Sequence, residues 1–206
     1  MRRIHWRATA HRDQLMVRQE EKESTPRAIV ILDRAETRWS AQAGQSEAKD
    51  SAFETMLSMC VSVAARLMFE GYLVSVCDQD GRELCDPLAD DADIPAMLAS
   101  FATLTARGAD GWNQLRALVP EGGAGPVVLL TRSVSIDEAA AIAPLAHAST
   151  FAVLFSAESD PAAVAECHHA GWRTSTVTPT PVHARDEAVL TAWLAALEQG
   201  ASRVDS

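Results

Sequence analysis

The sequence lacks most of the motifs by which an enzyme of its size is recognised. Its four cysteines have no C-x-x-C spacing and no signal peptide is recognised before them, so we expect reduced thiols in a cytoplasmic protein. No G-x-G-x-x-G follows the first predicted strand, and neither G-x-x-x-x-G-K-[ST] nor G-x-S-x-G occurs. These absences argue against a dinucleotide-binding Rossmann domain, a P-loop and the nucleophile elbow of an α/β-hydrolase.

Positive charge is scarce outside the first 26 residues. The chain of 206 residues has 18 Lys and Arg against 28 Asp and Glu, a net charge of −10. Residues 1–26 hold six basic and four acidic side chains, which leaves 12 basic and 24 acidic ones for the rest. Because nonspecific nucleic-acid binding needs a basic face, this acidic body argues against nucleic acid as a partner.

Only one hydrophobic run is long enough to suggest a membrane span. This is AFETMLSMCVSVAARLMF (52–69), which contains Glu54 and Arg66. A charge near the centre of a spanning helix costs about 3 kcal/mol, so we predict a buried helix that ends at Gly71 and no membrane span.

From residue 27 onward, predicted strands alternate with predicted helices. We expect strands at residues 27–33, 72–78, 82–85, 127–131, 150–156 and 173–179. Helices are expected at residues 52–69, 93–108, 112–119, 135–148, 160–171 and 184–200. Crossovers of this length imply an α/β fold of three layers. Its sheet would have six strands, mostly parallel with one antiparallel edge strand (82–85), and helices on both faces.

The third predicted strand would follow a tight turn. The stretch VCDQDGRELC (76–85) predicts a hairpin around Asp80 and Gly81. Such a turn would set Cys77 opposite Cys85 or Leu84, depending on the length of the loop. The sequence leaves open whether the two cysteines pair.

The segment before residue 27, which contains RRIHWRATAHRDQLMVRQEE (2–21), does not belong to the alternating body. It resembles the signature that precedes the first von Willebrand factor A-like strand in a widespread bacterial family, domain of unknown function 58. The resemblance is strong in residues 2–33 and continues afterwards through the order of elements alone. The shared residues are Arg3, Ile4, Trp6, Arg7, Ala10, Leu15, Met16, Val17 and Arg18.

This resemblance implies a domain organisation and a cellular setting. Residues 1–26 would be the family-signature segment, residues 27–200 a von Willebrand A-like domain, and residues 201–206 a frayed C-terminus. Family members look longer at the N-terminus, with membrane helices, so the chain resembles an N-terminally truncated member. The family implies a cytoplasmic domain that works with a MoxR-type AAA+ ATPase in assembly or chaperone-like roles.

The end of the first strand, AIVILDRAET (28–37), is where A-type domains hold a divalent metal. Their D-x-S-x-S motif is completed by a threonine and by an aspartate after the fourth strand, which supply the oxygen ligands that Mg²⁺ prefers. Here Asp33 is kept and Thr37 can stand in for the last serine, but Ala35 replaces a hydroxyl. Arg132, followed by Ser133, stands where the family has its aspartate.

We therefore predict a degenerate metal-ion-dependent adhesion site without a cofactor. The hypothesis is that Arg132 pairs with Asp33 and takes the position of the metal ion, since an arginine does not deprotonate. The candidate binding face is the carboxyl edge of the sheet, where ligands bind in open α/β folds. Its residues are Asp33, Ala35, Thr37, Arg132 and Ser133.

Several alternatives to this interpretation remain open at the level of sequence. A Mg²⁺ ion could still bind through Asp33, Glu36 and Thr37, which would make the chain a metal-dependent protein-binding domain. Asp33 and Arg132 could also form an internal salt bridge that binds nothing. An unrecognised hydrolase would need a nucleophile and a base at the strand ends, and no Cys or His is well placed for it. The leading interpretation is a noncatalytic protein-interaction module.

Overall fold

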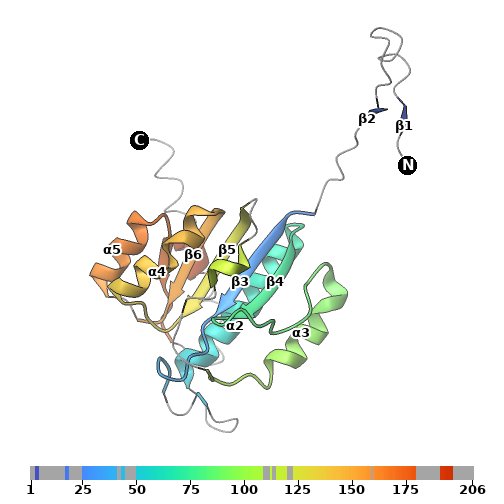
Figure 1. The fold of residues 1–206 in the computed structure, drawn as a ribbon. Helices are drawn as coiled ribbons and strands as arrows, with labels where there is room; N and C mark the ends of the chain where they lie inside the picture. The colour runs from blue at the N-terminus through green and yellow to red at the C-terminus, as the bar shows by residue number, and fades with distance from the viewer. Residues whose placement is uncertain are drawn as a thin grey trace.

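A parallel sheet of five strands forms the centre of the fold in the computed structural model (Figure 1). The structure describes residues 25–40, 43–44, 50–108, 112, 115–119, 123–158, 160–179 and 191–196, and the backbone of residues 3–4 and 17–18. The strands of the sheet are β3 (Arg27–Leu32), β4 (Leu73–Asp78), β5 (Ala124–Thr131), β6 (Ser149–Ser156) and β7 (Arg173–Thr176).

The strand order is β4-β3-β5-β6-β7, and every pairing in the sheet is parallel. The chain leaves β3 toward one edge of the sheet to form β4, and then returns to the other side of β3 to form β5. Open α/β sheets of this kind have a switch point between two such strands. The predicted α/β class is confirmed, and the switch point lies between β3 and β5.

The central strands are buried on both faces because nearly all of their residues are apolar. Along β3, Ala28, Val30 and Leu32 belong to one hydrophobic cluster, and Ile29 and Ile31 belong to another. Side chains alternate along a strand, so the two clusters lie on opposite faces of the sheet. The chain therefore has two cores, one on each side of the sheet.

Helix α2 (Ser51–Phe69) covers the first of these faces. Asp50 caps its N-terminus by accepting hydrogen bonds from the backbone N–H groups of Ala52 and Phe53, and Gly71 follows its end with a φ of 89°. Among the described residues it is the one helix long and apolar enough to cross a membrane. However, 61% of its most apolar 18-residue window is buried within the fold. Burial against the sheet accounts for its composition.

The remaining helices complete the two outer layers. Helix α3 (Ile94–Phe101) follows a 3-10 turn, η1 (Asp91–Asp93), and packs in the same cluster as α2, together with residues 191–196. The other face is covered by η2 (Leu115–Leu118), α4 (Ile136–His147) and α5 (Pro161–His169). Helix α4 contains Pro144 and ends at His147, close to the predicted range 135–148.

The helix predicted at residues 93–108 is shorter than expected. It ends at Phe101, and the residues after it form a loop that returns to the carboxyl edge of the sheet. There the backbone N–H of Ala106 bonds to the carbonyl of Ala43, and that of Arg107 bonds to the carbonyl of Arg34. Tertiary hydrogen bonds thus replace the last helical turns, and they bring Arg107 to the strand ends.

The sixth, antiparallel strand expected at residues 82–85 is not formed as a strand. Residues 82–88 return along the free edge of β4, where they make two isolated antiparallel bridges, Val74 with Leu88 and Cys77 with Glu83. The turn therefore places Cys77 opposite Glu83, and neither Leu84 nor Cys85 is its partner. All four cysteines are free thiols.

The segment of residues 1–26 is described only in part. Its strands β1 (Arg3–Ile4) and β2 (Val17–Arg18) form an antiparallel pair in which Arg3 faces Arg18 and Ile4 faces Val17. Trp6, Arg7 and Ala10 lie outside the described residues, as do residues 201–206 and the parts of the predicted helix 184–200 before residue 191 and after residue 196.

Candidate functional site

The candidate site lies at the carboxyl ends of β3 and β5, on either side of the switch point. Asp33 follows β3 directly, and its backbone N–H donates to the carbonyl of Leu130 over 2.8 Å. Thr131 is the last residue of β5. The side chains of both Asp33 and Thr131 are fully buried. The parallel pairing of the two strands brings their ends together, so an acidic and a hydroxyl side chain meet under the loops.

The carboxylate of Asp33 is saturated by other groups of the protein. Its Oδ1 accepts a hydrogen bond of 3.0 Å from the backbone N–H of Ala35. Its Oδ2 accepts a hydrogen bond of 2.6 Å from Oγ1 of Thr131, and it lies 2.7 Å from Nε of Arg38. A buried carboxylate needs both a counter-ion and hydrogen bonds to stay ionised, and Asp33 has both.

Arg38 is the counter-ion, and it is held from three sides. Only 8% of its side chain is exposed, and its Nη1 pairs with Oε1 of Glu138 in α4. Its Cζ lies 4.6 Å from the ring centroid of Trp112, a cation–π arrangement. Nε1 of Trp112 donates to the same oxygen of Glu138 over 3.2 Å. The guanidinium is thus fixed between two carboxylates and the face of an indole.

Glu138 is kept ionised by the same contacts. Burial alone would raise the pKa of Glu138, but hydrogen bonds from Arg38, Ser135 and Trp112 outweigh it and lower the pKa to about 2. Its other oxygen accepts from the backbone N–H of Ser135, so the residue also closes the capping box at the start of α4. Glu138 therefore links Arg38 to the N-terminus of α4, the helix that follows β5.

The pairing predicted between Asp33 and Arg132 is wrong. Nε of Arg132 donates to Glu158 over 2.9 Å, and its Nη1 lies 3.7 Å from Asp50, the residue that caps α2. An arginine does neutralise Asp33, but it is Arg38. The physical reason is direction: the side chain of Arg132 is 28% exposed and runs outward to the rim, whereas Arg38 folds back from the loop after β3.

The other predicted site residues are not gathered around Asp33. Glu36 and Thr37 are exposed, and neither side chain makes a hydrogen bond or ion pair within the described part of the chain. Ala35 is buried and offers only its backbone N–H. Ser133 takes part through its backbone carbonyl, which accepts from Oγ1 of Thr131 over 3.2 Å.

These residues do not fit a divalent metal ion. No three His, Cys, Asp or Glu side chains of the described ranges are grouped so that they could hold one. A divalent ion about 4 Å from the guanidinium of Arg38 would be repelled by about 8 kcal/mol at an effective dielectric constant of about 20. Both oxygens of Asp33 already have partners. The site has the fixed charge of an arginine where a metal site needs free oxygen ligands.

A second buried arginine, Arg34, follows Asp33 in the chain. Nε and Nη2 of Arg34 donate to the carbonyl of Thr105 over 2.9 and 2.6 Å, and its Nη1 lies 4.0 Å from Asp78. Burial lowers the pKa of Arg34, the neighbouring Arg107 lowers it further, and Asp78 partly opposes both. Hydrogen bonds to a backbone carbonyl thus hold this cation in the loop that carries Arg107.

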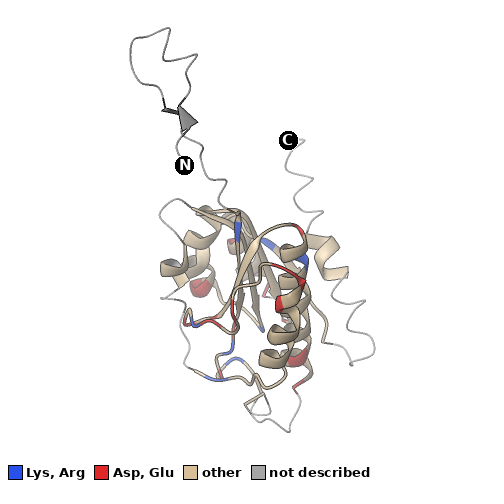
Figure 2. Ribbon diagram, turned by 90° about the vertical axis from the view of Figure 1, so that its right-hand side faces the viewer, with Lys and Arg blue, Asp and Glu red and all other residues tan. Residues whose placement is uncertain are grey.

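Arg107, in the loop after α3, has an exposed side chain. Its side chain makes no hydrogen bond or ion pair with another residue that the structure describes. Basic and acidic segments lie close together around the carboxyl edge of the sheet in Figure 2. This edge therefore presents an exposed cation that has no partner among the described residues, on a protein whose net charge is strongly negative.

Three residues around Asp33 were not predicted from the sequence, namely Arg38, Glu138 and Trp112. Their positions follow no motif, because they come from the loop after β3, from α4 and from the segment before η2. No family model matches the chain, and no curated protein matches it. The geometry of the strand ends is therefore the main basis for a functional interpretation.

Proposed function

We propose that the chain is a noncatalytic protein-interaction module of the von Willebrand A-like bacterial family domain of unknown function 58, with a degenerate metal-ion-dependent adhesion site. Its partner in the cytoplasm would be a MoxR-type AAA+ ATPase, in an assembly or chaperone-like role. Two observations support the A-type assignment. The parallel sheet carries helices on both faces, and residues 82–88 run antiparallel beside β4, where the A-type fold has its third strand.

The single observation that carries the proposal is the pairing of Arg38 with Asp33. In A-type domains the metal ion at this point binds a carboxylate of the partner protein through an open coordination position. Here the positive charge next to Asp33 belongs to a side chain with 8% exposure, whose donors face Asp33 and Glu138. A partner could not reach it, so recognition must use cations nearer the surface.

Arg107 supplies such a cation. Its side chain is exposed, whereas Arg132, which is 28% exposed at the rim of the same edge, is already paired with Glu158 and Asp50. An arginine binds a carboxylate through two parallel hydrogen bonds, so it can replace a metal ion in docking an acidic side chain. The expected epitope on the partner is therefore an acidic loop that reaches the carboxyl edge of the sheet.

The composition of the strand ends favours binding over catalysis. The hydroxyl of Thr131 lies 2.6 Å from a carboxylate, which resembles a nucleophile with its base. However, both residues are fully buried, and Oδ2 of Asp33 is also paired with Arg38. No substrate could reach this hydroxyl without unpacking the loops, so the hydrolase alternative is not favoured.

The proposal is tested by binding of a purified, nucleotide-free MoxR-type AAA+ ATPase from the same organism, measured by surface plasmon resonance. We expect binding that is equal in EDTA and in Mg²⁺, and that weakens at least tenfold in Arg107→Glu. Arg66→Glu is the matched control, because Arg66 is an exposed arginine on α2 that pairs only with its neighbour Glu70. Absence of binding, or equal weakening by both substitutions, would refute the proposal.

The alternative is a Mg²⁺-dependent A-type protein-binding domain that uses Asp33, Glu36 and Thr37. In that case, binding of the ATPase would be lost in EDTA and would depend on Thr37. The exposure of Glu36 and Thr37, and the saturation of Asp33 by Arg38, favour the metal-independent version.

A further inference from the structure

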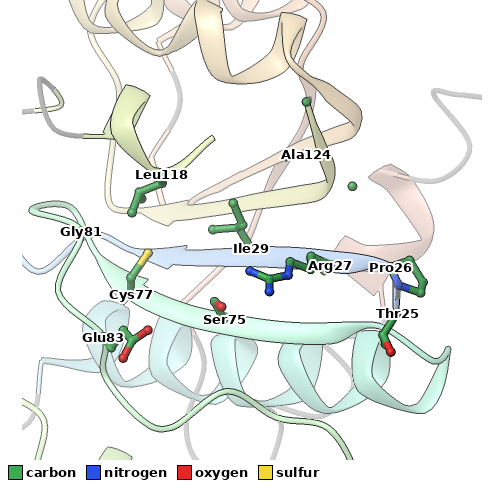
Figure 3. A pocket seen from close by; sticks show the side chains of 13 residues that line it. Thr25, Pro26, Arg27, Ile29, Ser75, Cys77, Gly81, Glu83, Leu118 and Ala124 are labelled. Carbon is green, nitrogen blue, oxygen red and sulfur yellow. The ribbon is translucent and has the colours of Figure 1, made fainter. Parts of the chain in front are cut away.

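A cavity of about 350 Å³ lies on the sheet face opposite α2, away from the strand ends (Figure 3). Its floor is made by Ile29 of β3 and by Ser75 and Cys77 of β4, and Leu118 of η2 and Ala124 of β5 form its walls. Pockets that bind small ligands begin at about this size and are mostly apolar with a few polar groups. None of the residues of the proposed docking edge, such as Asp33, Arg38 and Arg107, lines this cavity.

The cavity exists because the crossover from β4 to β5 does not cover this face with a helix. Helix α3 packs with α2 on the opposite face, and among the described residues of this crossover Trp112 and η2 are the part that packs on the face with the cavity. Two glycines keep the ends open. A Cβ on Gly81 would lie 3.2 Å from Leu118, and a Cβ on Gly125 would lie 2.1 Å from the carbonyl oxygen of Arg27. The close approach of β5 to β3 therefore requires glycine at position 125.

The cavity is lined by the hydroxyl groups of Thr25 and Ser75 and by the charged groups of Arg27 and Glu83. Arg27, Ser75 and Glu83 make no side-chain hydrogen bond or ion pair with any residue in the described part of the structure. Figure 3 shows the side chain of Arg27 lying along β3 toward Ser75, and not pointing away from the sheet. A cation, a hydroxyl and a carboxylate thus share one apolar cavity.

The two charges are too far apart to satisfy each other. Arg27 is in register with Leu73, and Glu83 is bridged to Cys77. These positions are four residues apart on β4, or about 13 Å along the strand. The side chain of Arg27 lies along this direction and shortens the gap, but no ion pair forms. A ligand that satisfied both groups would need an anionic and a cationic end separated by several ångströms.

From this arrangement we infer that the cavity is a binding site for a short zwitterionic peptide of two or three residues with free termini. The carboxylate of the peptide binds Arg27, its ammonium group binds Glu83, and Ser75 bonds to a peptide group between them. An extended chain of three residues spans about 10 Å, which is comparable to the distance along β4 between the positions that face Arg27 and Glu83. Small apolar side chains would contact Ile29 and Leu118.

Trialanine is the probe for this site, and the full chain is titrated with it while backbone amides are followed by NMR. We expect saturable shifts that centre on Ile29, Ser75 and Cys77, with a Kd of about 1 mM or tighter. N-acetyl-trialanine and trialanine amide each lack one charge, and each is expected to bind roughly tenfold more weakly because it loses one charge-assisted contact.

Two substitutions assign the charges to their residues. Arg27→Gln should remove the preference for trialanine over its amide, and Glu83→Gln should remove the preference over the acetylated peptide. Arg82→Gln is the matched control, because Arg82 is an exposed neighbour that does not line the cavity, and it should change neither.

Three results would overturn the inference. The first is the absence of saturable shifts up to about 10 mM peptide. The second is a set of shifts centred on Asp33 and the strand ends. The third is equal affinity for all three peptides, which would show that the termini are not recognised.

Discussion

Replacing Arg38 by alanine should destabilise the protein more than the loss of any surface ion pair. The substitution leaves Asp33, which is fully buried, without a counter-ion. Removing one partner of a buried ion pair typically costs about 3–5 kcal/mol, because the remaining charge stays desolvated. Asp33 would keep its hydrogen bonds from Ala35 and Thr131, which places the expected loss near the lower end, about 3 kcal/mol.

Urea unfolding followed by circular dichroism measures this loss, with Arg66→Ala as the matched control. Arg66 pairs with Glu70 one helical turn away, and both side chains are more than half exposed. Such pairs contribute about 0.5 kcal/mol or less, so the control should be nearly neutral. If Arg38→Ala cost no more than Arg66→Ala, the buried pair would not be a significant source of stability.

A double-mutant cycle identifies the partner. Asp33→Asn removes the negative charge and keeps one oxygen that can accept from the backbone N–H of Ala35, while its amide nitrogen can donate to Oγ1 of Thr131. If Arg38 acts through Asp33, the double variant should be less destabilised than the sum of the two single variants, by about 1–3 kcal/mol. Additive effects would contradict a direct interaction between the two residues.

Three further predictions concern other parts of the fold. The pKa of Glu138 is lowered from its ordinary value of 4.5 to about 2, so its contribution to stability is complete above pH 4.5 and is lost as the pH falls toward 2. When the free energy of unfolding is measured as a function of pH, Glu138→Gln should therefore lose less stability between pH 4.5 and 2 than the unaltered protein. Equal losses would refute the lowered pKa of Glu138. Gly125→Ala should lower the free energy of unfolding, measured by urea denaturation, by about 1–3 kcal/mol, because its Cβ would overlap the carbonyl of Arg27; a neutral result would contradict this close approach. Burial, and to a smaller extent the negative charges of Asp86 and Glu83, raise the pKa of Cys85 to about 11, so at pH 8 this partly exposed thiol should react slowly with a thiol reagent. The three buried cysteines should react only when the protein unfolds. Fast labelling of all four cysteines in the folded protein would contradict their burial.

The elements that the sequence predicted well are those whose signals are local. Apolar runs gave four of the strands in the sheet to within a few residues, and Gly71 marked the end of α2. The edge strand β7 ends at Thr176 and is shorter than the strand predicted at residues 173–179. Local hydrogen bonding and side-chain periodicity are sufficient to set these boundaries.

The features that the sequence did not predict depend on contacts between distant segments. The end of α3 at Phe101 follows from backbone hydrogen bonds to residues 43 and 34, which lie more than 50 positions earlier. The same holds for the candidate site. A cation beside Asp33 was expected from the missing oxygen ligands, but the choice between Arg38 and Arg132 depends on the path of the loop after β3, which has no sequence signature.

The central claim is that a guanidinium takes the place of a metal ion beside Asp33, and a crystal soaked in Mn²⁺ tests it most directly. Anomalous scattering locates manganese without reference to any assumed ligand. We predict no anomalous density at the carboxyl ends of β3 and β5, with Arg38 still bound to Asp33. An anomalous peak within bonding distance of the Asp33 carboxylate, with Arg38 displaced, would contradict the account.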